Sequence, residues 1–241
     1  MNLNIAGKKA LVTGGTRGIG AAIAQALLEE GCTVTITGRS AREGWWSNQG
    51  NCRLEVCDFS DDAATDVLCE QVTGAGYDLL VNNSGSFYAA DIADLELSQW
   101  ESLLQVNLTT PMRLIQAVAV SMRRHGWGRI VNVGSIAASV TRSNMAAYAS
   151  SKAGLAGLTR AAALDLAPAG ILVNCICPAY TETDMLAALD AAARETLLAK
   201  VPLGKYARPE DVAAATLFLL SNQNQFITGQ QLILDGGVTI Q

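Results

Sequence analysis

The sequence predicts a single α/β domain, a doubly wound parallel sheet of about seven strands with helices on both faces. Short apolar runs alternate along the chain with longer, alanine-rich stretches of helical spacing, which is the pattern of parallel strands joined by crossover helices. A glycine-rich turn follows the first apolar run. Half of the 241 residues are hydrophobic and 16% are charged, which suits one large core. Residues 1–241 are therefore predicted to form one domain.

Seven apolar runs are the candidate strands, and no stretch between them resembles a linker or a repeat. In chain order they are residues 10–13, 33–37, 53–57, 79–82, 129–133, 172–176 and 231–234. The clearest helical patterns between them cover residues 20–30, 98–124 and 146–167. In such a sheet, ligands bind where the strands end, so each segment that follows a strand is a candidate site.

Composition argues against several classes of partner. The net charge of −5 and the pI near 4.9 give no basic footprint for nucleic acid or an anionic membrane. No apolar run approaches the roughly 20 residues of a membrane span, and the N-terminus lacks a signal-peptide pattern, so we expect a cytoplasmic protein. The cysteines show no metal-ligand spacing, and there is one histidine, His125, so no metal site is expected. We expect reduced thiols at Cys32, Cys52, Cys57, Cys69, Cys175 and Cys177.

The glycine-rich turn, Thr-Gly-Gly-Thr-Arg-Gly-Ile-Gly at residues 13–20, leads into a helix. Glycines let the chain turn tightly and let a ligand approach the helix N-terminus, where free N–H groups favour phosphate. A P-loop needs a lysine and a hydroxyl residue after its last glycine, and here Ala21 and Ala22 follow. A purely structural turn is the alternative. The place of the turn after the first strand favours a Rossmann-like dinucleotide site contacted by Gly14, Thr16, Arg17, Gly18, Ile19 and Gly20.

The end of the second strand indicates which dinucleotide binds. Enzymes that prefer NAD usually carry an acidic residue near this point, which accepts hydrogen bonds from the ribose. Positions 37 and 38 hold no acid, and Arg39 and Ser40 follow at once. Arg39 and Arg17 suit a 2′-phosphate through charge-assisted bonds, although both could be solvated surface arginines. The sequence predicts NADP(H) rather than NAD(H).

Tyr148 and Lys152 stand four residues apart in Tyr-Ala-Ser-Ser-Lys, so on a helix they share one face. A free phenol is too weak an acid to exchange protons readily near neutral pH, and a nearby ammonium favours the phenolate. The pair can therefore act as a proton donor and its activator. The alternative is an aromatic ring packed inward and a lysine in water.

Together these motifs resemble those of the short-chain dehydrogenase/reductase family over essentially the whole chain. The glycine turn, Asn-Asn-Ser-Gly at 82–85, Asn107, Ser135 and the Tyr148–Lys152 pair occur in the family's order and spacing. The resemblance implies that a carbonyl is reduced with hydride from NADPH. It implies that Ser135 polarises the carbonyl oxygen, that Tyr148 gives the proton, and that Lys152 tunes Tyr148 and holds the nicotinamide ribose. It also implies that Asn107 holds a water that completes a proton relay.

The resemblance carries further positions over to this chain. It implies that residues 180–208 form a lid over the substrate. The amphipathic pattern of residues 185–200 predicts one helix in this segment, and simple surface packing is the alternative to a lid. Ser84 stands where the family has alanine, and Ala179 stands where it has glycine. The additional cofactor contacts that it implies are Asp58, Phe59, Asn82, Ser84, Gly85, Pro178, Ala179, Thr181 and Thr183.

Within the family the chain looks most like 3-oxoacyl-(acyl-carrier-protein) reductases, which use arginines at the pocket mouth to hold an acidic carrier. Arg123, Arg124 and Arg129 are the candidates for that role. Ala169 replaces an expected basic residue, and residues 38–51 are short and carry two tryptophans. Another ketone, sugar or polyketide-like substrate is therefore the alternative, and a non-catalytic cofactor-binding regulator is a remote one. Apolar faces on the helices that begin near residues 98 and 146 favour a homo-oligomer, a tetramer or a dimer.

Overall fold

The computed structural model describes residues 2–240 and contains a parallel seven-stranded sheet with the order β3-β2-β1-β4-β5-β6-β7. Each pair of neighbouring strands is parallel. The strands are β1 (Lys9–Val12), β2 (Thr33–Gly38), β3 (Cys52–Val56), β4 (Leu79–Asn82), β5 (Gly128–Val133), β6 (Ile171–Pro178) and β7 (Gln231–Leu234). The predicted fold class is confirmed, and every predicted strand is present.

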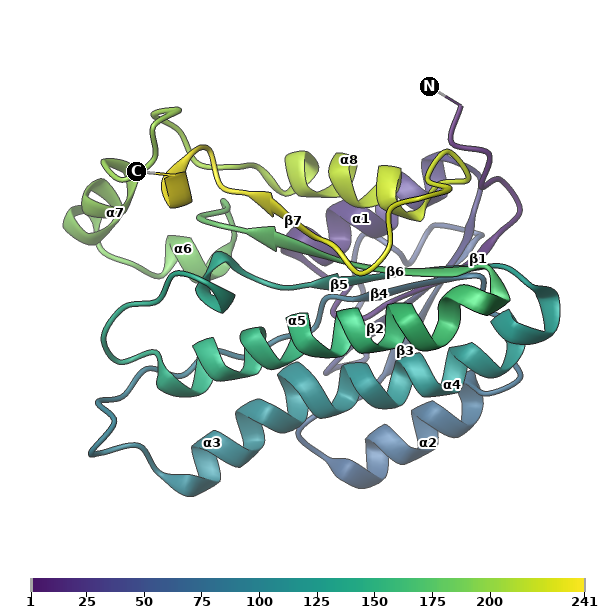
Figure 1. Ribbon diagram of the computed structural model, residues 1–241, viewed down its shortest axis with the longest axis horizontal. Helices are drawn as coiled ribbons and strands as arrows, with labels where there is room; N and C mark the ends of the chain where they lie inside the picture. Colours follow the sequence, from purple (N-terminus) through teal and green to yellow (C-terminus); the bar gives the residue numbers. More distant parts are fainter. Residues whose placement is uncertain (1, 241) are drawn as a thin grey trace.

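Helices cover both faces of the sheet, as Figure 1 shows. Helices α1 (Gly18–Glu29) and α8 (Pro209–Leu220) pack together on one face, and α2 (Asp62–Val72), α4 (Thr110–His125) and α5 (Ala146–Leu166) cover the other. The remaining helical segments are α3 (Leu97–Leu104), η1 (Gln105–Thr109), η2 (Ile136–Ala138), η3 (Ala167–Ala169), α6 (Asp184–Ala187), α7 (Ala191–Leu198) and η4 (Val238–Ile240). Two large apolar clusters form the core, one on each side of the sheet, and a small third cluster of Leu186, Leu197 and Tyr206 follows β6 in the chain.

The strand order determines where a ligand can bind. The chain crosses from β1 outward to β2 and β3, then returns to β4 on the other side of β1. The connections after β1 and β4 therefore leave in opposite directions, which opens a crevice at the carboxyl ends of these strands. The glycine turn follows β1, the Asn-Asn-Ser-Gly motif spans the end of β4, and Ser135 follows β5.

Two helical predictions need correction. The single helix expected over residues 98–124 is α3 and α4 joined by the π-helical turn η1, and π turns often mark functional sites. The single lid helix expected over residues 185–200 is split into α6 and α7. Asp190 causes this break, because its carboxylate caps the new helix by accepting a hydrogen bond from the Ala193 N–H (2.7 Å).

Candidate active site

The glycine turn is shaped to receive a phosphate group. Gly14 has φ +64°, a left-handed conformation that glycine adopts at low cost. A Cβ on Gly20 would lie 2.3 Å from the Gly14 carbonyl oxygen, so only glycine lets α1 start this close to the turn. In the described chain, no side chain caps the N-terminus of α1, and its first turn holds no acid. Its N–H groups and its positive dipole end therefore fit a diphosphate.

Side chains that the sequence reading did not single out hold this turn in place. The Asn83 amide donates to the carbonyl oxygens of Thr13 (2.8 Å) and Gly14 (3.2 Å). The main-chain N–H groups of Asn83 and Ser84 both donate to the Thr13 hydroxyl at 2.9 Å. The pair Asn82-Asn83 at the end of β4 is the sequence feature that could have predicted this role, since the carboxyl end of β4 lies beside that of β1.

A second tether comes from the short connection between β2 and β3. The indole N–H of Trp45 donates to the Gly15 carbonyl oxygen (3.2 Å). Trp46 packs edge-to-face on Trp45, with ring centroids 5.9 Å apart. Two tryptophans in a short connection were noticed in the sequence, but their contact with the glycine turn was not predicted.

The residues predicted at the adenosine end occupy different environments. Arg39 and Ser40 are exposed at the end of β2. Asp58 lies near Arg39, and its pKa is lowered mainly by hydrogen bonds from Ser60, with a smaller effect from Arg39. Phe59 is buried in the core, so only its main chain can contact a cofactor.

The predicted lid touches the glycine turn. Arg17 forms an ion pair with Asp184 of α6 (3.0 Å), and Gly18 lies against Thr183, since an added Cβ would be 3.3 Å from the Thr183 methyl group. The glycine turn and the loop after β6 therefore face each other across the crevice.

Asn82 belongs to a buried polar chain across the sheet. Its amide donates to the Asn132 side-chain oxygen (2.8 Å), and the Asn132 amide donates to the Thr159 hydroxyl of α5 (2.9 Å). The Asn82 side chain is buried and is directed along this chain, so it connects β4 and β5 to α5. A cofactor contact by Asn82 stays a prediction for its main chain.

Lys152 is buried on α5, whereas the alternative interpretation of the sequence placed this lysine in water. Its ammonium donates to the Val133 carbonyl oxygen (2.9 Å) and lies 5.7 Å from the centroid of the Tyr148 ring. Tyr148 is half-buried and makes an edge-to-face contact with Phe87, with ring centroids 5.2 Å apart. The phenol and the ammonium thus lie together at the carboxyl end of β5.

Asn107 in η1 connects the helices to the loop after β4. Its side-chain oxygen accepts the Ser86 N–H (2.8 Å), while its amide donates to the Ser86 carbonyl (2.9 Å) and the Ser151 hydroxyl (3.1 Å). A Cβ on Gly85 would lie 3.5 Å from the Asn107 oxygen and 3.6 Å from the Lys152 ammonium. Asn107, Gly85 and Lys152 therefore meet at one point.

Ser135 is the N-cap of η2 and is separated from β5 by Gly134 alone, and η2 packs against α5. The Ser135 oxygen accepts the Ala137 N–H (3.1 Å). A hydroxyl that accepts one bond still has its own hydrogen to donate, so Ser135 can offer a hydrogen bond to a ligand oxygen.

The loop after β6 is held by main-chain bonds. Pro178 is the last residue of β6, and the Ala179 N–H donates to the Leu234 carbonyl oxygen (3.0 Å). Thr181 forms a bridge with Ala207. Among residues 2–240, the buried Thr181 hydroxyl is one of four buried side-chain polar atoms without a hydrogen-bond partner. The predicted contact between this hydroxyl and the cofactor therefore requires a cofactor group that can enter the loop.

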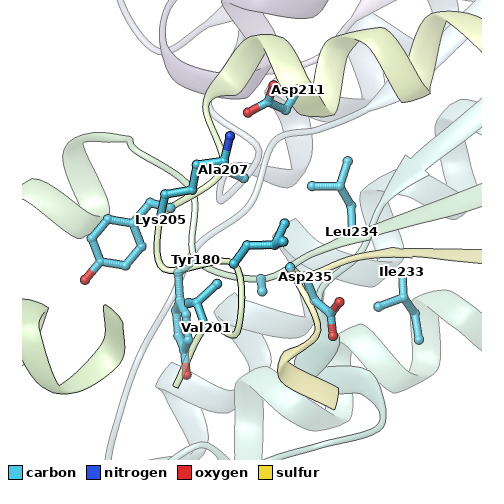
Figure 2. Close-up of a pocket in the computed structure, with 12 residues that line it drawn as sticks. Tyr180, Val201, Lys205, Ala207, Asp211, Ile233, Leu234 and Asp235 are labelled. Atoms are coloured by element: carbon cyan, nitrogen blue, oxygen red, sulfur yellow. The ribbon is translucent and has the colours of Figure 1, made fainter. Parts of the chain in front are cut away.

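A cavity of about 400 Å³ lies between this loop, the lid and β7, and Figure 2 shows the residues that line it. Its apolar lining includes Val201, Leu203 and Ile233, while Lys205 and Asp211 lie at one end (Figure 2). Tyr180 lines it, but Ser135, Tyr148 and Lys152 are not among the described residues that do. We therefore locate the reactive groups from the hydrogen-bonded cluster at the end of β5 and not from this cavity.

The predicted carrier-binding role of Arg129 is wrong. Its guanidinium is buried and donates to the carbonyl oxygens of Asn224 (3.0 Å) and Gly170 (3.2 Å), and burial lowers its pKa to about 10. Arg129 is near the start of β5, and Arg123 and Arg124 are in the last turn of α4 just before that strand. All three therefore lie toward the amino ends of the parallel strands, whereas the cluster around Tyr148 lies at the carboxyl end of β5.

Comparison with known proteins identifies the family. A family model described as enoyl-(acyl carrier protein) reductase matches residues 14–239. The 3-oxoacyl-(acyl-carrier-protein) reductase FabG of Vibrio cholerae is 36% identical over 98% of this chain and 99% of its own length. The chain belongs to the short-chain dehydrogenase/reductase family. This family member is accordingly an oxidoreductase that interconverts alcohol and carbonyl groups with a nicotinamide cofactor.

Other relatives carry different names. FabG of Aquifex aeolicus is 35% identical over 99% of this chain and all of its own length. A solved structure titled a putative NAD(P)-dependent gluconate 5-dehydrogenase from Beutenbergia cavernae, with bound NADP, has TM-score 0.93 and 33% identity, covering both chains completely. A gluconate 5-dehydrogenase from Burkholderia cenocepacia in complex with NADP and tartrate has TM-score 0.92 and 31% identity, covering 100% of this chain and 98% of that one.

The described residues offer neither a metal-binding cluster nor a membrane-spanning helix. Residues 2–240 contain no cluster of three or more His, Cys, Asp or Glu side chains that could hold a metal ion. Across the same span, no helix has both the length and the apolar character that a membrane crossing requires. All six cysteines are free thiols.

Proposed function

We propose that the protein is an NADPH-dependent reductase that converts the ketone of a 3-oxoacyl thioester to a secondary alcohol. The observation that carries this proposal is the meeting of Tyr148, Lys152 and Asn107 beside Ser135 at the carboxyl end of β5. The curated relatives named FabG support the substrate class.

The residues of the crevice fit NADP(H). The uncapped N-terminus of α1 would hold the diphosphate through the N–H groups of Gly18, Ile19 and Gly20, with Gly14 and Thr16 beside them. Exposed Arg39 and Ser40 would bind the 2′-phosphate, and the absence of an acid at the end of β2 disfavours NAD(H). Thr183, opposite Gly18, would close over the phosphates. Structures with TM-scores of 0.93 and 0.92 contain NADP.

The proposed reaction follows from the hydrogen bond and the proton that these side chains can donate to a carbonyl oxygen. The bound nicotinamide supplies the hydride for the carbonyl carbon. Ser135 donates its free hydroxyl hydrogen to the carbonyl oxygen, and Tyr148 transfers its phenolic proton to the same oxygen as the alcohol forms. The Lys152 ammonium stabilises the phenolate that remains. In the oxidative direction, Tyr148 accepts the proton instead.

Asn107 would hold, through its main-chain carbonyl oxygen, the water that returns a proton to this site. Its side chain is already committed to Ser86 and Ser151, so it is a poor ligand for the water that the family resemblance implied. The π turn η1 changes the helical bonding around this residue. The Asn107 carbonyl oxygen is therefore the group that we assign to the water near Lys152.

A sugar acid is the second candidate substrate. Two solved relatives are described as a putative gluconate 5-dehydrogenase and a gluconate 5-dehydrogenase, and the arginines expected to hold an acidic carrier lie toward the amino ends of the strands, away from the cluster around Tyr148. A reductase of this kind would act on a keto acid of a sugar with the same proton donor. The two candidates differ in the substrate, not in the catalytic groups.

The test is a panel of 3-oxoacyl thioesters, keto sugar acids and simple ketones with NADPH, followed at the absorbance of the reduced nicotinamide. The proposal expects the highest kcat/KM for a 3-oxoacyl thioester, and a higher value for a keto sugar acid would replace it with the second candidate. Tyr148→Phe should lower kcat by about 10²–10⁴-fold while NADPH still binds. NADPH binding without turnover of any substrate would support a regulatory protein instead.

We also propose a cytoplasmic homo-oligomer, a tetramer or a dimer. Free thiols at all six cysteines suit a reducing compartment. Large apolar side chains are exposed on α5 and next to β7, with Leu164 78% and Phe226 98% exposed, and a second copy would bury them. A monomer in sizing with light scattering would overturn this assignment.

A further inference from the structure

The hydroxyl of Ser151 lies inside α5, between the two residues of the Tyr148–Lys152 pair. Ser151 is fully buried, with 0% of its surface exposed, whereas the neighbouring Ser150 is exposed. The Ser151 hydroxyl donates to the Tyr148 carbonyl oxygen (2.7 Å) and accepts an N–H of the Asn107 amide (3.1 Å). One hydroxyl therefore connects the main chain of the proposed proton donor to the π turn η1.

Asn107 continues this connection to the loop after β4. Its side-chain oxygen accepts the Ser86 N–H (2.8 Å), and its amide donates to the Ser86 carbonyl oxygen (2.9 Å). A side-chain amide has two N–H groups, and here one is used by Ser86 and the other by Ser151. The orientation of the Asn107 side chain therefore depends on the Ser151 hydroxyl as well as on Ser86.

Phe87 completes the connection on the ring of Tyr148. The two rings are in edge-to-face contact with centroids 5.2 Å apart, an arrangement that aromatic pairs prefer. Phe87 follows Ser86 in the chain, so the contacts return to the residue from which they began. Tyr148 is therefore held at its main chain by Ser151 and at its ring by Phe87, in one closed circuit of contacts.

A second hydroxyl of α5 has the same bonding pattern outside this circuit. The Thr159 hydroxyl, also fully buried, donates to the Leu155 carbonyl oxygen (2.8 Å) and accepts the Asn132 amide N–H (2.9 Å). It lies about two helical turns beyond Ser151. Hydroxyls that bond to a helix carbonyl are common and show no function by themselves, so Thr159 is the matched control for Ser151.

We propose that Ser151 is a positioning residue for Tyr148: its hydroxyl closes the circuit that holds the phenol beside Lys152 and fixes the orientation of Asn107. Without this hydroxyl, a buried N–H of Asn107 loses its acceptor, and the link from η1 to the Tyr148 main chain is broken. Proton transfer requires the phenol to lie within hydrogen-bond distance of the substrate oxygen, so its rate is sensitive to small displacements. The inference rests on the proposed proton transfer from Tyr148.

The test compares Ser151→Ala with Thr159→Val, since each removes one hydroxyl of the same bonding pattern. The loss of one buried hydrogen bond predicts a kcat about tenfold lower for Ser151→Ala, counted per NADPH-binding site, with the KM for NADPH within about twofold of the parent value. Thr159→Val should lose a similar amount of thermal stability but keep kcat per site within about twofold. If Ser151→Ala does not fold, Ser151→Cys takes its place, because a thiol weakens both bonds, and should lose kcat about threefold.

A double-mutant cycle with Phe87→Leu tests the circuit itself. Residues that act as one unit give losses that do not add in free energy. The double variant Ser151→Ala/Phe87→Leu should therefore lose less kcat than the product of the two single losses. The losses of Thr159→Val and Phe87→Leu should multiply.

Each outcome bears on one proposal. Equal kcat per site in the parent and in Ser151→Ala, or in Ser151→Cys where it replaces that variant, would overturn the positioning role. Equal losses of kcat in the Ser151 and Thr159 variants, or losses that multiply with Phe87→Leu, would overturn it too. Tyr148→Phe separates the two proposals: if it retains full turnover, the assignment of Tyr148 as proton donor fails. If Tyr148→Phe is inactive while Ser151→Ala is unaffected, only the positioning role fails.

Discussion

The Arg17 guanidinium and the Asp184 carboxylate, 167 positions apart in the sequence, form an ion pair with an Nη1–Oδ2 distance of 3.0 Å. The pair joins the glycine turn to the first helix of the predicted lid. Both side chains are well exposed, at 68% and 73%, so the pair adds little to stability. Its effect is local, because Asp184 pairs with the Arg17 guanidinium, which would otherwise be available to bind a cofactor phosphate.

Replacing Asp184 with Asn should therefore lower the KM for NADPH by about two- to threefold at low ionic strength, since Arg17 becomes free to meet phosphate. The melting temperature should stay nearly constant. Steady-state kinetics at two salt concentrations measure the effect, and Glu182→Gln, which removes another exposed lid carboxylate, is the control. A higher KM in Asp184→Asn would mean that the pair assists binding instead.

Trp45→Phe should raise the KM for NADPH about fivefold with little change in kcat. The variant loses the indole hydrogen bond to Gly15, which is worth about 1 kcal/mol, and so loosens the glycine turn away from the reacting groups. The matched control is Trp46→Phe, which alters the packing but keeps that bond. The expectation fails if both variants change the KM equally.

Arg39→Ala should reduce the preference for NADPH over NADH by at least about tenfold, because a charge-assisted bond to the 2′-phosphate is lost. The kcat/KM with NADH should hardly change. Arg42→Ala, which removes another exposed arginine from the same connection, should leave the preference intact. An unchanged preference in Arg39→Ala would assign the 2′-phosphate to other residues.

The protein should lose stability between about pH 9 and pH 11. Burial raises the pKa of Cys32 and Cys57 from 9.0 to about 11. Below pH 9 the thiols are neutral in both states, and above it they ionise first in the unfolded chain, which favours unfolding. Each thiol should cost up to about 2–3 kcal/mol by pH 11. Urea unfolding at pH 7.5, 9 and 10.5 measures this loss, which should be smaller in Cys32→Ala; an equal loss in that variant would exclude Cys32 as a source.

Local patterns were sufficient to predict the strands, because each is a short apolar run bounded by turn residues. They failed where one residue changes the geometry of a helix. The π turn around Asn107 and the break at Asp190 interrupt sequences that still have helical spacing. Neither interruption alters the apolar pattern that predicted the helices.

Part of the site could also be predicted from local sequence patterns. The spacing of Tyr148 and Lys152 places both on one face of any helix, and a glycine turn after a first strand predicts a dinucleotide in any parallel sheet. Asn83 and Trp45 were missed, because their hydrogen bonds reach residues 69 and 30 positions away. No local pattern encodes such partners.

By itself, the sequence determined the fold class, the glycine turn and the order of the reactive groups, since periodicity and spacing act over a few residues. The tertiary structure decided which side chains are buried and which groups they contact. It buried Lys152 against Val133, placed Arg129 at the amino end of the strands, and brought Asn83 to the glycine turn. Burial and hydrogen-bond partners depend on how distant strands pack, and for that reason only the folded chain specifies them.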